Sequence, residues 1–179
     1  MSNIALNVLI GISRYRWSVA ILAALVDGGA RFAEILHKVG LSRDSLSRNL
    51  NSLIENGWVT RNPGHGHPLR PEYLLTAEGL SLASRAMAVL KVQEQLGLDA
   101  KDMTRWILPL IHVLAGEKKR FNEIDRTLPE ASPRALSISL KAMASLGLLE
   151  RTIVDDYPPV TEYILSSNGQ MLAGALAIA

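Results

Sequence analysis

Hydrophobic and polar residues alternate along the first half of the chain with the spacing of amphipathic helices. The apolar positions predict a helix over 17–26, a second over 31–39 and a third over 43–56. Asp27-Gly28-Gly29 and Gly40-Leu41 separate them, because glycine favours turns. The predicted order is therefore three short helices joined by tight turns.

The third predicted helix has the clearest division between an apolar and a polar face. Leu46, Leu50 and Leu53 recur at three- and four-residue spacing, as in a helix with one buried face. Ser42 stands where an N-cap residue accepts a backbone hydrogen bond, and Asn56-Gly57 ends the pattern. The opposite face is polar and is expected to meet solvent or a ligand.

Two short extended segments follow this helix. They cover 58–61 and 73–76, and the residues between them are rich in Gly and Pro, which predicts a β-hairpin. Residues 77–96 have helical composition and end at Gly97-Leu98-Asp99, so we expect a linker helix there. Helix, turn, helix and hairpin is the order of a winged helix-turn-helix domain.

The chain repeats itself at a spacing of about 90 residues. Arg16-Trp17 recurs as Arg105-Trp106, and Arg31-Phe32 recurs as Arg120-Phe121. After an insertion of one residue, the correspondence continues through Ser42, Leu46, Ser47, Leu50, Gly57 and Arg61, which recur as Ser132, Leu136, Ser137, Leu140, Gly147 and Arg151. Such collinearity predicts a duplicated domain. We therefore expect a mainly α protein with small β-hairpins, built from two tandem winged helix-turn-helix domains over 1–96 and 97–179.

The polar face of the third helix carries residue types that contact DNA bases. A helix that enters the major groove has one face anchored in its own domain and hydrogen-bond donors on the other. The predicted contacts with double-stranded DNA from this helix are Arg43, Ser45, Ser47, Arg48, Asn49 and Asn51. The equivalent helix of the second copy offers Arg134, Ser137 and Lys141. The hairpins add Arg61, His65, His67, Arg70 and Arg151 beside the phosphate backbone.

The order of short motifs in the second copy is distinctive. The motifs are Arg120-Phe-Asn-Glu-Ile124, Ser132-Pro-Arg-Ala-Leu-Ser137, Gly147-Leu-Leu-Glu-Arg151 and Pro158-Pro-Val-Thr-Glu-Tyr163. This order resembles the HxlR-type winged-helix regulators, relatives of the MarR group. The first copy carries the corresponding motifs in the same order, although Gly64-His-Gly-His67 stands where the family usually has a short Pro-rich turn. The resemblance implies a sequence-specific DNA-binding transcriptional regulator of bacterial type.

The tandem arrangement departs from that family. Its members usually carry one domain per chain and act as homodimers on two half-sites, so the resemblance implies that this chain replaces the dimer. We expect the copies to pack as an intrachain pseudo-dimer through the apolar segments 4–12, 80–96 and 169–179. A homodimer of the whole chain is one alternative. A protein-interaction scaffold whose winged helices bind no DNA is another.

Composition narrows the chemistry further. The chain contains no cysteine, which excludes disulfides, thiolate metal ligands and the cysteine sensing of oxidants that some relatives use. The net charge is only +2. The first 96 residues carry ten Lys and Arg against seven Asp and Glu, whereas the remainder carries nine against ten. This imbalance predicts stronger DNA binding by the first copy.

Other constellations indicate neither a catalytic nor a metal site. His65 and His67 are two candidate ligands, but two ligands do not make a metal site. No nucleophile with a base, carboxylate pair or phosphate-binding Gly loop stands at a convincing spacing, so we expect no cofactor and no enzymatic activity. Trp17 and Trp106 occupy equivalent positions, which favours a packing role. The alternative is a pocket for a small apolar effector between the first helix and the linker helix.

Apolar runs at the two ends of the chain are too short to cross a bilayer. Residues 4–10 and 171–179 fall well below the roughly 20 residues that a membrane span needs. No basic segment precedes the first run, so it lacks the pattern of a secretory signal. We expect both runs to be packing helices in a cytoplasmic protein.

Overall fold

The structure is a computed structural model that describes residues 5–62, 72–154 and 159–177. The elements of the first half are α1 (Leu6–Ile12), α2 (Ser18–Ala24), β1 (Ala30–Arg31), α3 (Phe32–Val39), α4 (Arg43–Glu55), β2 (Val59–Asn62), β3 (Glu72–Leu75) and α5 (Ala77–Gln95). Those of the second half are α6 (Ile107–Val113), β4 (Lys119–Arg120), α7 (Phe121–Thr127), α8 (Pro133–Ser145), β5 (Leu149–Val154), β6 (Val160–Leu165) and α9 (Ser167–Ala177). The second half repeats the order from α2 to α5, so the predicted duplication and the mainly α fold are confirmed.

Each half contains a small antiparallel sheet that the sequence pattern predicted only in part. The expected hairpins are β2–β3 and β5–β6, but a two-residue strand joins each of them, giving the orders β1-β3-β2 and β4-β6-β5. These extra strands place Arg31 opposite Glu72 and Arg120 opposite Glu162. A two-residue strand has no periodicity of its own, and its partner is distant in sequence. Local patterns therefore could not reveal it.

The boundaries of α4 and α8 are fixed by the same local chemistry. The hydroxyls of Ser42 and Ser132 accept hydrogen bonds from backbone N–H groups of the first turn, at 3.3 and 3.2 Å. Gly57 and Gly147 follow the helices with φ of 75° and 67°, left-handed conformations that favour glycine. The N-cap and the helix end predicted for the first copy are confirmed.

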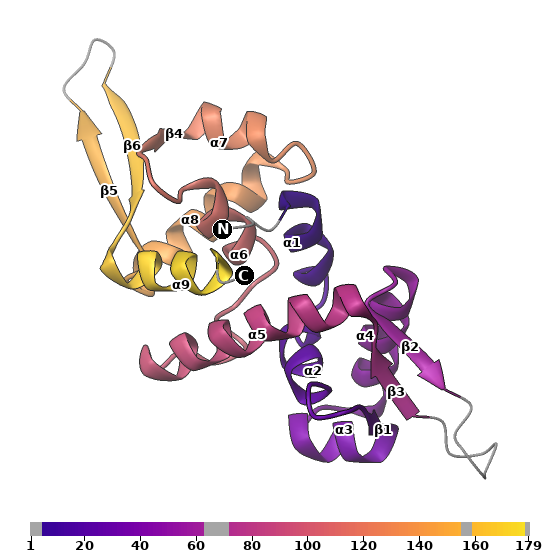
Figure 1. The fold of residues 1–179 in the computed structure, drawn as a ribbon. Helices are drawn as coiled ribbons and strands as arrows, with labels where there is room; N and C mark the ends of the chain where they lie inside the picture. The colour runs from indigo at the N-terminus through magenta and orange to yellow at the C-terminus, as the bar shows by residue number, and fades with distance from the viewer. Residues whose placement is uncertain (1–4, 63–71, 155–158, 178–179) are drawn as a thin grey trace.

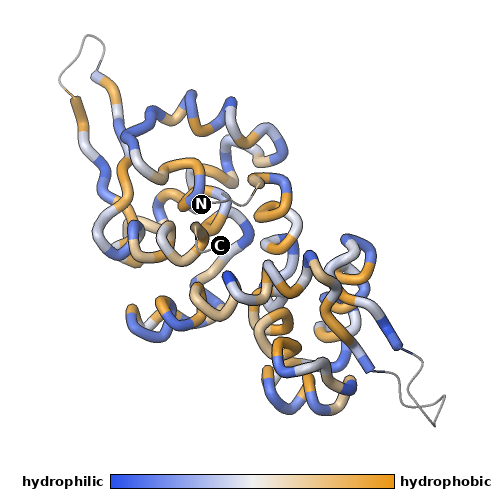
Figure 2. The backbone as a smooth tube through the Cα atoms, in the orientation of Figure 1, coloured by the Kyte–Doolittle hydropathy of each residue, from blue (hydrophilic) through white to orange (hydrophobic). Residues whose placement is uncertain are grey.

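Helices from the two halves share one hydrophobic core. α5 packs on α2 in its own half and on α9 in the other half, and α1 packs on α6 (Figure 1). Figure 2 shows hydrophobic positions along each of these helices. No helix among the described residues is both long enough and apolar enough to cross a membrane. The apolar ends of the chain instead form α1 and α9, which cover the contact between the halves.

The contact between the halves is closely filled. A void of only about 20 Å³ is lined by Leu9 and Leu82 from the first half and by Leu108 and Leu176 from the second. The buried guanidinium of Arg85 donates from Nη1 to the Leu176 carbonyl at 2.8 Å. A charge-assisted bond in a buried site is strongly directional, so it orients α5 against α9. The three apolar segments expected to join the halves therefore meet here.

The two hairpins project from opposite ends of the molecule (Figure 1). β2 and β3 extend from one end, and β5 and β6 extend from the other, with α1, α5 and α9 between them. The core therefore holds two helix-turn-helix units whose hairpins are directed outward.

Candidate nucleic-acid interface

Helix α4 presents a polar face while its other face is anchored in the core. Leu46, Leu50 and Leu53 are at most 1% exposed. The exposed polar residues on the solvent side include Arg43, Ser47, Arg48 and Asn51. Arg48 also donates from Nε to the carbonyl of Asp44 at 3.4 Å, one turn earlier in the same helix. The four side chains are accessible from solvent, in the position that a recognition helix requires.

Asn49 does not belong to this polar face, and its predicted contact with DNA is wrong. Its side chain is 3% exposed. The amide nitrogen donates to the Ser45 carbonyl at 2.7 Å, and the amide oxygen accepts from the Ser18 hydroxyl at 3.4 Å. A buried amide must satisfy its hydrogen bonds inside the protein, and this one ties α4 to the start of α2. Ser45 is half-buried, and its hydroxyl accepts from Ser42, so it supports the start of the helix.

Helix α8 repeats this division into two faces with different polar residues. Leu136, Leu140 and Met143 are at most 2% exposed and anchor the helix. The outward side carries Arg134, Ser137, Ile138 and Lys141, of which Ser137 is half-buried. We call α4 and α8 the recognition helices of the two halves.

The recognition helices differ in charge at equivalent positions. Arg134 occupies the position that Asp44 has in α4. Ile138 occupies the position of Arg48. As a result, α4 combines two arginines with two acidic residues, whereas α8 carries two cations and no acidic residue. The advantage predicted for the first copy from the net charge of each half does not extend to these helices, and it stays a prediction.

The hairpin strands bring two more arginines to the surface. Arg61 on β2 and Arg151 on β5 are exposed and occupy equivalent positions of the repeat. Arg151 Nη2 donates to the Thr161 hydroxyl at 3.4 Å on the neighbouring strand. The other predicted hairpin contacts, His65, His67 and Arg70, lie outside the described residues. The strands therefore add one exposed cation to the recognition helix of each half.

Ion pairs connect the start of the helix before each recognition helix to the hairpin. Arg31 Nε lies 3.5 Å from Glu72 Oε1, and Arg120 Nε lies 3.9 Å from Glu162 Oε1. Because the pairs are partly exposed, each stabilises the fold by about 1 kcal/mol or less. Each pair joins residues that already lie opposite one another in the sheet. The repeat relates Arg31 to Arg120 but does not reveal that each pairs with a glutamate of the hairpin, although Glu72 and Glu162 also occupy equivalent positions.

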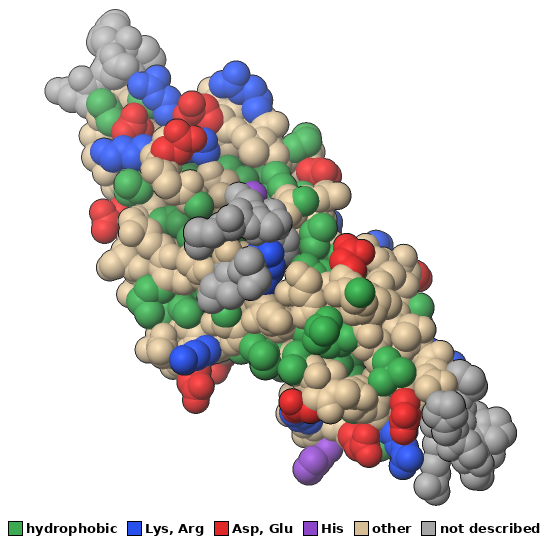
Figure 3. All heavy atoms as spheres, in the orientation of Figure 1, with side chains coloured by type: hydrophobic (Ala, Val, Ile, Leu, Met, Phe, Trp, Pro, Cys, Tyr) green, Lys and Arg blue, Asp and Glu red, His purple; other side chains and the backbone are tan. Residues whose placement is uncertain are grey.

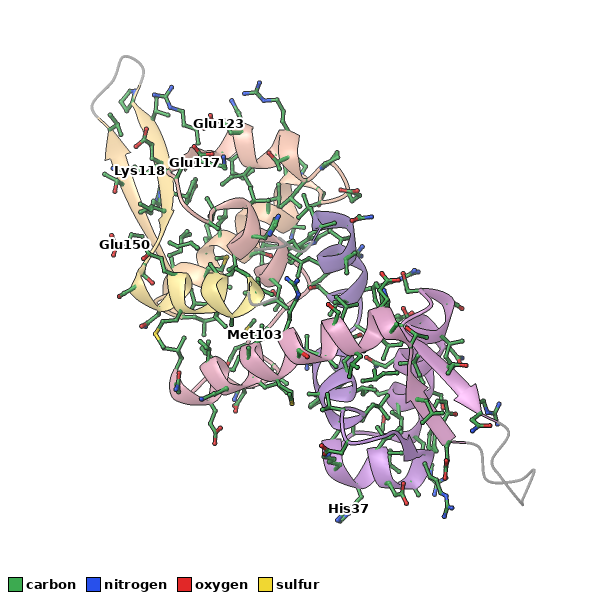
Figure 4. All side chains as sticks on the ribbon, in the orientation of Figure 1. His37, Met103, Glu117, Lys118, Glu123 and Glu150 are labelled. Atoms are coloured by element: carbon green, nitrogen blue, oxygen red, sulfur yellow. The ribbon has the colours of Figure 1, made fainter. Side chains whose placement is uncertain are left out.

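Among the described residues, the side chains with shifted pKa values belong to other elements than the recognition helices. Burial lowers the pKa of His112 on α6. A hydrogen bond from Lys119 lowers the pKa of Glu117, which precedes β4. His37 points from α3 into solvent (Figure 4). Within the described parts of the chain, no three His, Cys, Asp or Glu side chains lie close enough to hold a metal ion.

An open cleft of about 870 Å³ lies in the first half between α2, the end of α3 and α5. Its apolar lining includes Trp17, Ala20, Met87, Leu90 and Leu98, and its charged lining comprises Asp27, Lys38, Lys91, Glu94 and Asp99. Trp17 is half-buried, whereas its counterpart Trp106 is 7% exposed. Both tryptophans pack against the core, as predicted, and Trp17 also lines the cleft. Figure 3 shows hydrophobic side chains near the middle of the molecule and charged ones towards its ends.

Comparison with known proteins assigns both halves to one family. The HxlR-like helix-turn-helix family matches residues 12–98 and, a second time, residues 103–178. The two matches together cover most of the chain. The chain therefore belongs to the HxlR-like helix-turn-helix family and carries the family domain twice.

Individual relatives align with about one domain of this chain. The uncharacterized HTH-type transcriptional regulator YvaP from Bacillus subtilis is 35% identical over 72 residues, which are 40% of this chain and 67% of YvaP. An uncharacterized HTH-type transcriptional regulator from Methanothermobacter thermautotrophicus is 33% identical over 66 residues, 37% of this chain and 50% of that protein. The chain thus spans only half to two thirds of these relatives. The solved structure of the reduced form of the transcriptional regulator YodB from B. subtilis shares 27% identity over 55% of this chain and 81% of YodB, with a TM-score of 0.38.

Proposed function

We propose that this chain is a sequence-specific, double-stranded DNA-binding transcriptional regulator that works by binding and not by catalysis. The observation that carries the proposal is the pair of recognition helices, each anchored by buried leucines and each presenting cations outward. Membership of a helix-turn-helix family in both halves supports the same function. A regulator of bacterial type meets DNA in the cytoplasm, where we expect this protein to act.

We further propose that the domains over 1–96 and 97–179 act as an intrachain pseudo-dimer on two half-sites. The shared core and the bond from Arg85 to the Leu176 carbonyl support a fixed arrangement of the two halves. The hairpins at opposite ends support contact with an extended length of duplex (Figure 1). A homodimer of the whole chain is the competing arrangement, and it would place two chains on each operator.

Selection of duplexes from a random library tests the function itself. The protein is expected to enrich a defined sequence, and its affinity for that sequence should fall steeply between low and high salt, because contacts with phosphates release counterions. Binding is measured by fluorescence anisotropy at each salt concentration. If no sequence is enriched and no duplex is bound, the regulator proposal fails and a protein-interaction scaffold becomes the better account.

The Arg48→Ala variant tests the recognition helix of the first half. Arg48 is exposed on the polar face of α4, so its loss should weaken specific binding by on the order of 1–3 kcal/mol, the value of a good base contact, without loss of folding. The control is Lys101→Ala, which removes an exposed cation between α5 and α6. Equal affinity of Arg48→Ala and wild type for the selected operator would remove Arg48 from the interface.

We also propose that the cleft between α2 and α5 binds a small apolar effector. Its volume of about 870 Å³ is within the range of ligand pockets, and Trp17, Met87 and Leu90 give it an apolar lining. Because α5 also packs on α9, a ligand that moves α5 would change how the two halves sit together. The cleft therefore offers a route from ligand binding to DNA affinity.

The Met87→Glu variant tests the cleft. Anilinonaphthalene sulfonate, an apolar fluorescent probe, is expected to bind the wild type and to lose most of its fluorescence gain with Met87→Glu, because the new carboxylate enters the apolar lining. Met171→Glu is the matched control, since Met171 on α9 is 42% exposed, much like Met87 at 45%, and lies outside the cleft. The same loss in both variants would contradict a site at this cleft.

A further inference from the structure

The two recognition helices carry side chains of opposite chemistry at the position held by Arg48 in α4 and by Ile138 in α8. We propose that Ile138 contacts the 5-methyl group of a thymine, so that the operator is asymmetric, with a different base opposite Arg48. This inference rests on the proposed DNA-binding function and adds the chemistry that each half recognises. It is carried by the place of Ile138 on the helix, its exposure and the charges around it.

Ile138 is an exposed apolar residue on the side of α8 that carries the cations. It is 58% exposed, whereas the anchoring residues Leu140 and Met143 are at most 2% exposed. Arg134 lies four residues before it and Lys141 three residues after it, so all three side chains share one face of the helix. Ile138 therefore lies between the two cations on the exposed face of α8, opposite the face that is buried in the core.

The surroundings of Ile138 favour DNA over an apolar protein surface as its partner. Charged side chains are depleted from the centres of protein interfaces, whereas cations are the groups that meet a phosphate backbone. No carboxylate occurs anywhere in α8 to offset Arg134 and Lys141. An apolar group held between two cations matches a groove that is lined by phosphates and exposes methyl groups on its floor.

Thymine supplies the apolar group that an isoleucine can recognise in the major groove. The thymine 5-methyl distinguishes that base, and apolar side chains contact it, while isoleucine offers no hydrogen-bond donor to other base edges. Arg48 has the opposite chemistry, because a guanidinium forms paired hydrogen bonds with guanine O6 and N7. The two halves are therefore suited to different bases at the same position of their half-sites.

The duplication removes the reason for a symmetric operator. A homodimer uses identical helices twice, so its operator mirrors the two-fold symmetry of the protein. Here the two recognition helices are encoded separately and have diverged at the position of Arg48 and Ile138. A single chain can therefore present two unlike helices to its two half-sites, whereas a homodimer of single-domain chains presents the same helix to both.

Deoxyuridine substitution tests this inference on the operator obtained by selection. Each thymine is replaced in turn by deoxyuridine, which lacks only the methyl group, and affinity is measured for the wild type and for Ile138→Ala. The half-site that contacts α8 is identified with the Arg134→Ala/Lys141→Ala variant. Base changes in that half-site should lower the affinity of the wild type but not the affinity of this variant. One substitution in that half-site should weaken binding of the wild type about four-fold, the value of one buried methyl group. Ile138→Ala should bind both duplexes equally.

Two controls separate this contact from general effects. Ile153→Ala changes an isoleucine of β5 that is 65% exposed, and it should keep the four-fold difference. Thermal unfolding of Ile138→Ala should match the wild type, because an exposed isoleucine contributes little packing and alanine favours helix.

Ile138→Arg should shift the selected base in the α8 half-site from thymine to guanine.

Three results would overturn the inference while leaving DNA binding intact. They are a selected operator that is palindromic at this position, equal affinities for every deoxyuridine duplex, or an unchanged difference in Ile138→Ala. A protein that selects no duplex at all would overturn the proposed function, and this inference with it. The experiment therefore distinguishes the failure of the methyl contact from the failure of DNA binding.

Discussion

Replacing Gly79 by alanine is expected to destabilise the first half of the protein by about 3 kcal/mol. Gly79 lies in the first turn of α5, where a Cβ atom would overlap the backbone carbonyl oxygen of Trp58. That oxygen accepts from the Thr76 backbone N–H at 3.1 Å, and the Thr76 hydroxyl caps the helix by accepting from Gly79 N–H at 3.0 Å. The helix cannot move away without breaking these bonds. The measurement is the free energy of unfolding in urea.

The second half and a third glycine provide the comparison. Gly169 occupies the same place in α9, against the carbonyl oxygen of Leu148, so Gly169→Ala should be destabilising for the same reason. Gly174 lies later in α9 with no atom near the position of a Cβ, and Gly174→Ala should stabilise the helix by roughly 1 kcal/mol. If Gly79→Ala were as stable as Gly174→Ala, the close approach of α5 to the hairpin would be wrong.

The Arg134→Ala/Lys141→Ala variant is expected to lose at least 10-fold in operator affinity, at about 1–3 kcal/mol for each contact. Both side chains are exposed on α8, on the face opposite the buried Leu140. If each meets DNA, the slope of log affinity against log salt should also fall by about two. Anisotropy titrations over a range of salt concentrations measure both quantities.

A variant with the same change of charge elsewhere is the control for this result. Lys91→Ala/Lys101→Ala removes two exposed lysines of α5 and the segment after it, and it should change the salt slope much less. The Arg43→Ala/Arg48→Ala variant makes the equivalent change in the first half. The net charges of the two halves predict that it loses more operator affinity than Arg134→Ala/Lys141→Ala. An unchanged affinity in Arg134→Ala/Lys141→Ala would mean that the second half does not engage DNA.

The fold could be predicted from the sequence where local patterns determine the structure. The leucine spacing of α4, its N-cap at Ser42 and its end at Gly57 lie within one short segment, and each was predicted correctly. The duplicated order of elements followed from the repeat. The extra strands β1 and β4 were missed because they exist only through pairing with β3 and β6.

The candidate site was predicted less completely because exposure depends on distant segments. By spacing alone, Asn49 falls on the flank of the polar face. In the structure its buried side chain accepts a hydrogen bond from the hydroxyl of Ser18, 31 residues earlier. Trp17 and Trp106 are equivalent in sequence and differ in exposure. The two tryptophans therefore have different tertiary surroundings: Trp17 lines the cleft beside α5, whereas Trp106 belongs to the buried core.

A single chain is expected to bind a two-half-site operator with both of its recognition helices. Native mass spectrometry of the protein mixed with its selected duplex measures the composition of the complex directly. One chain per duplex is the expected result at every protein concentration at which a specific complex forms. A complex that contains two chains per duplex, or the absence of any specific complex, would contradict it.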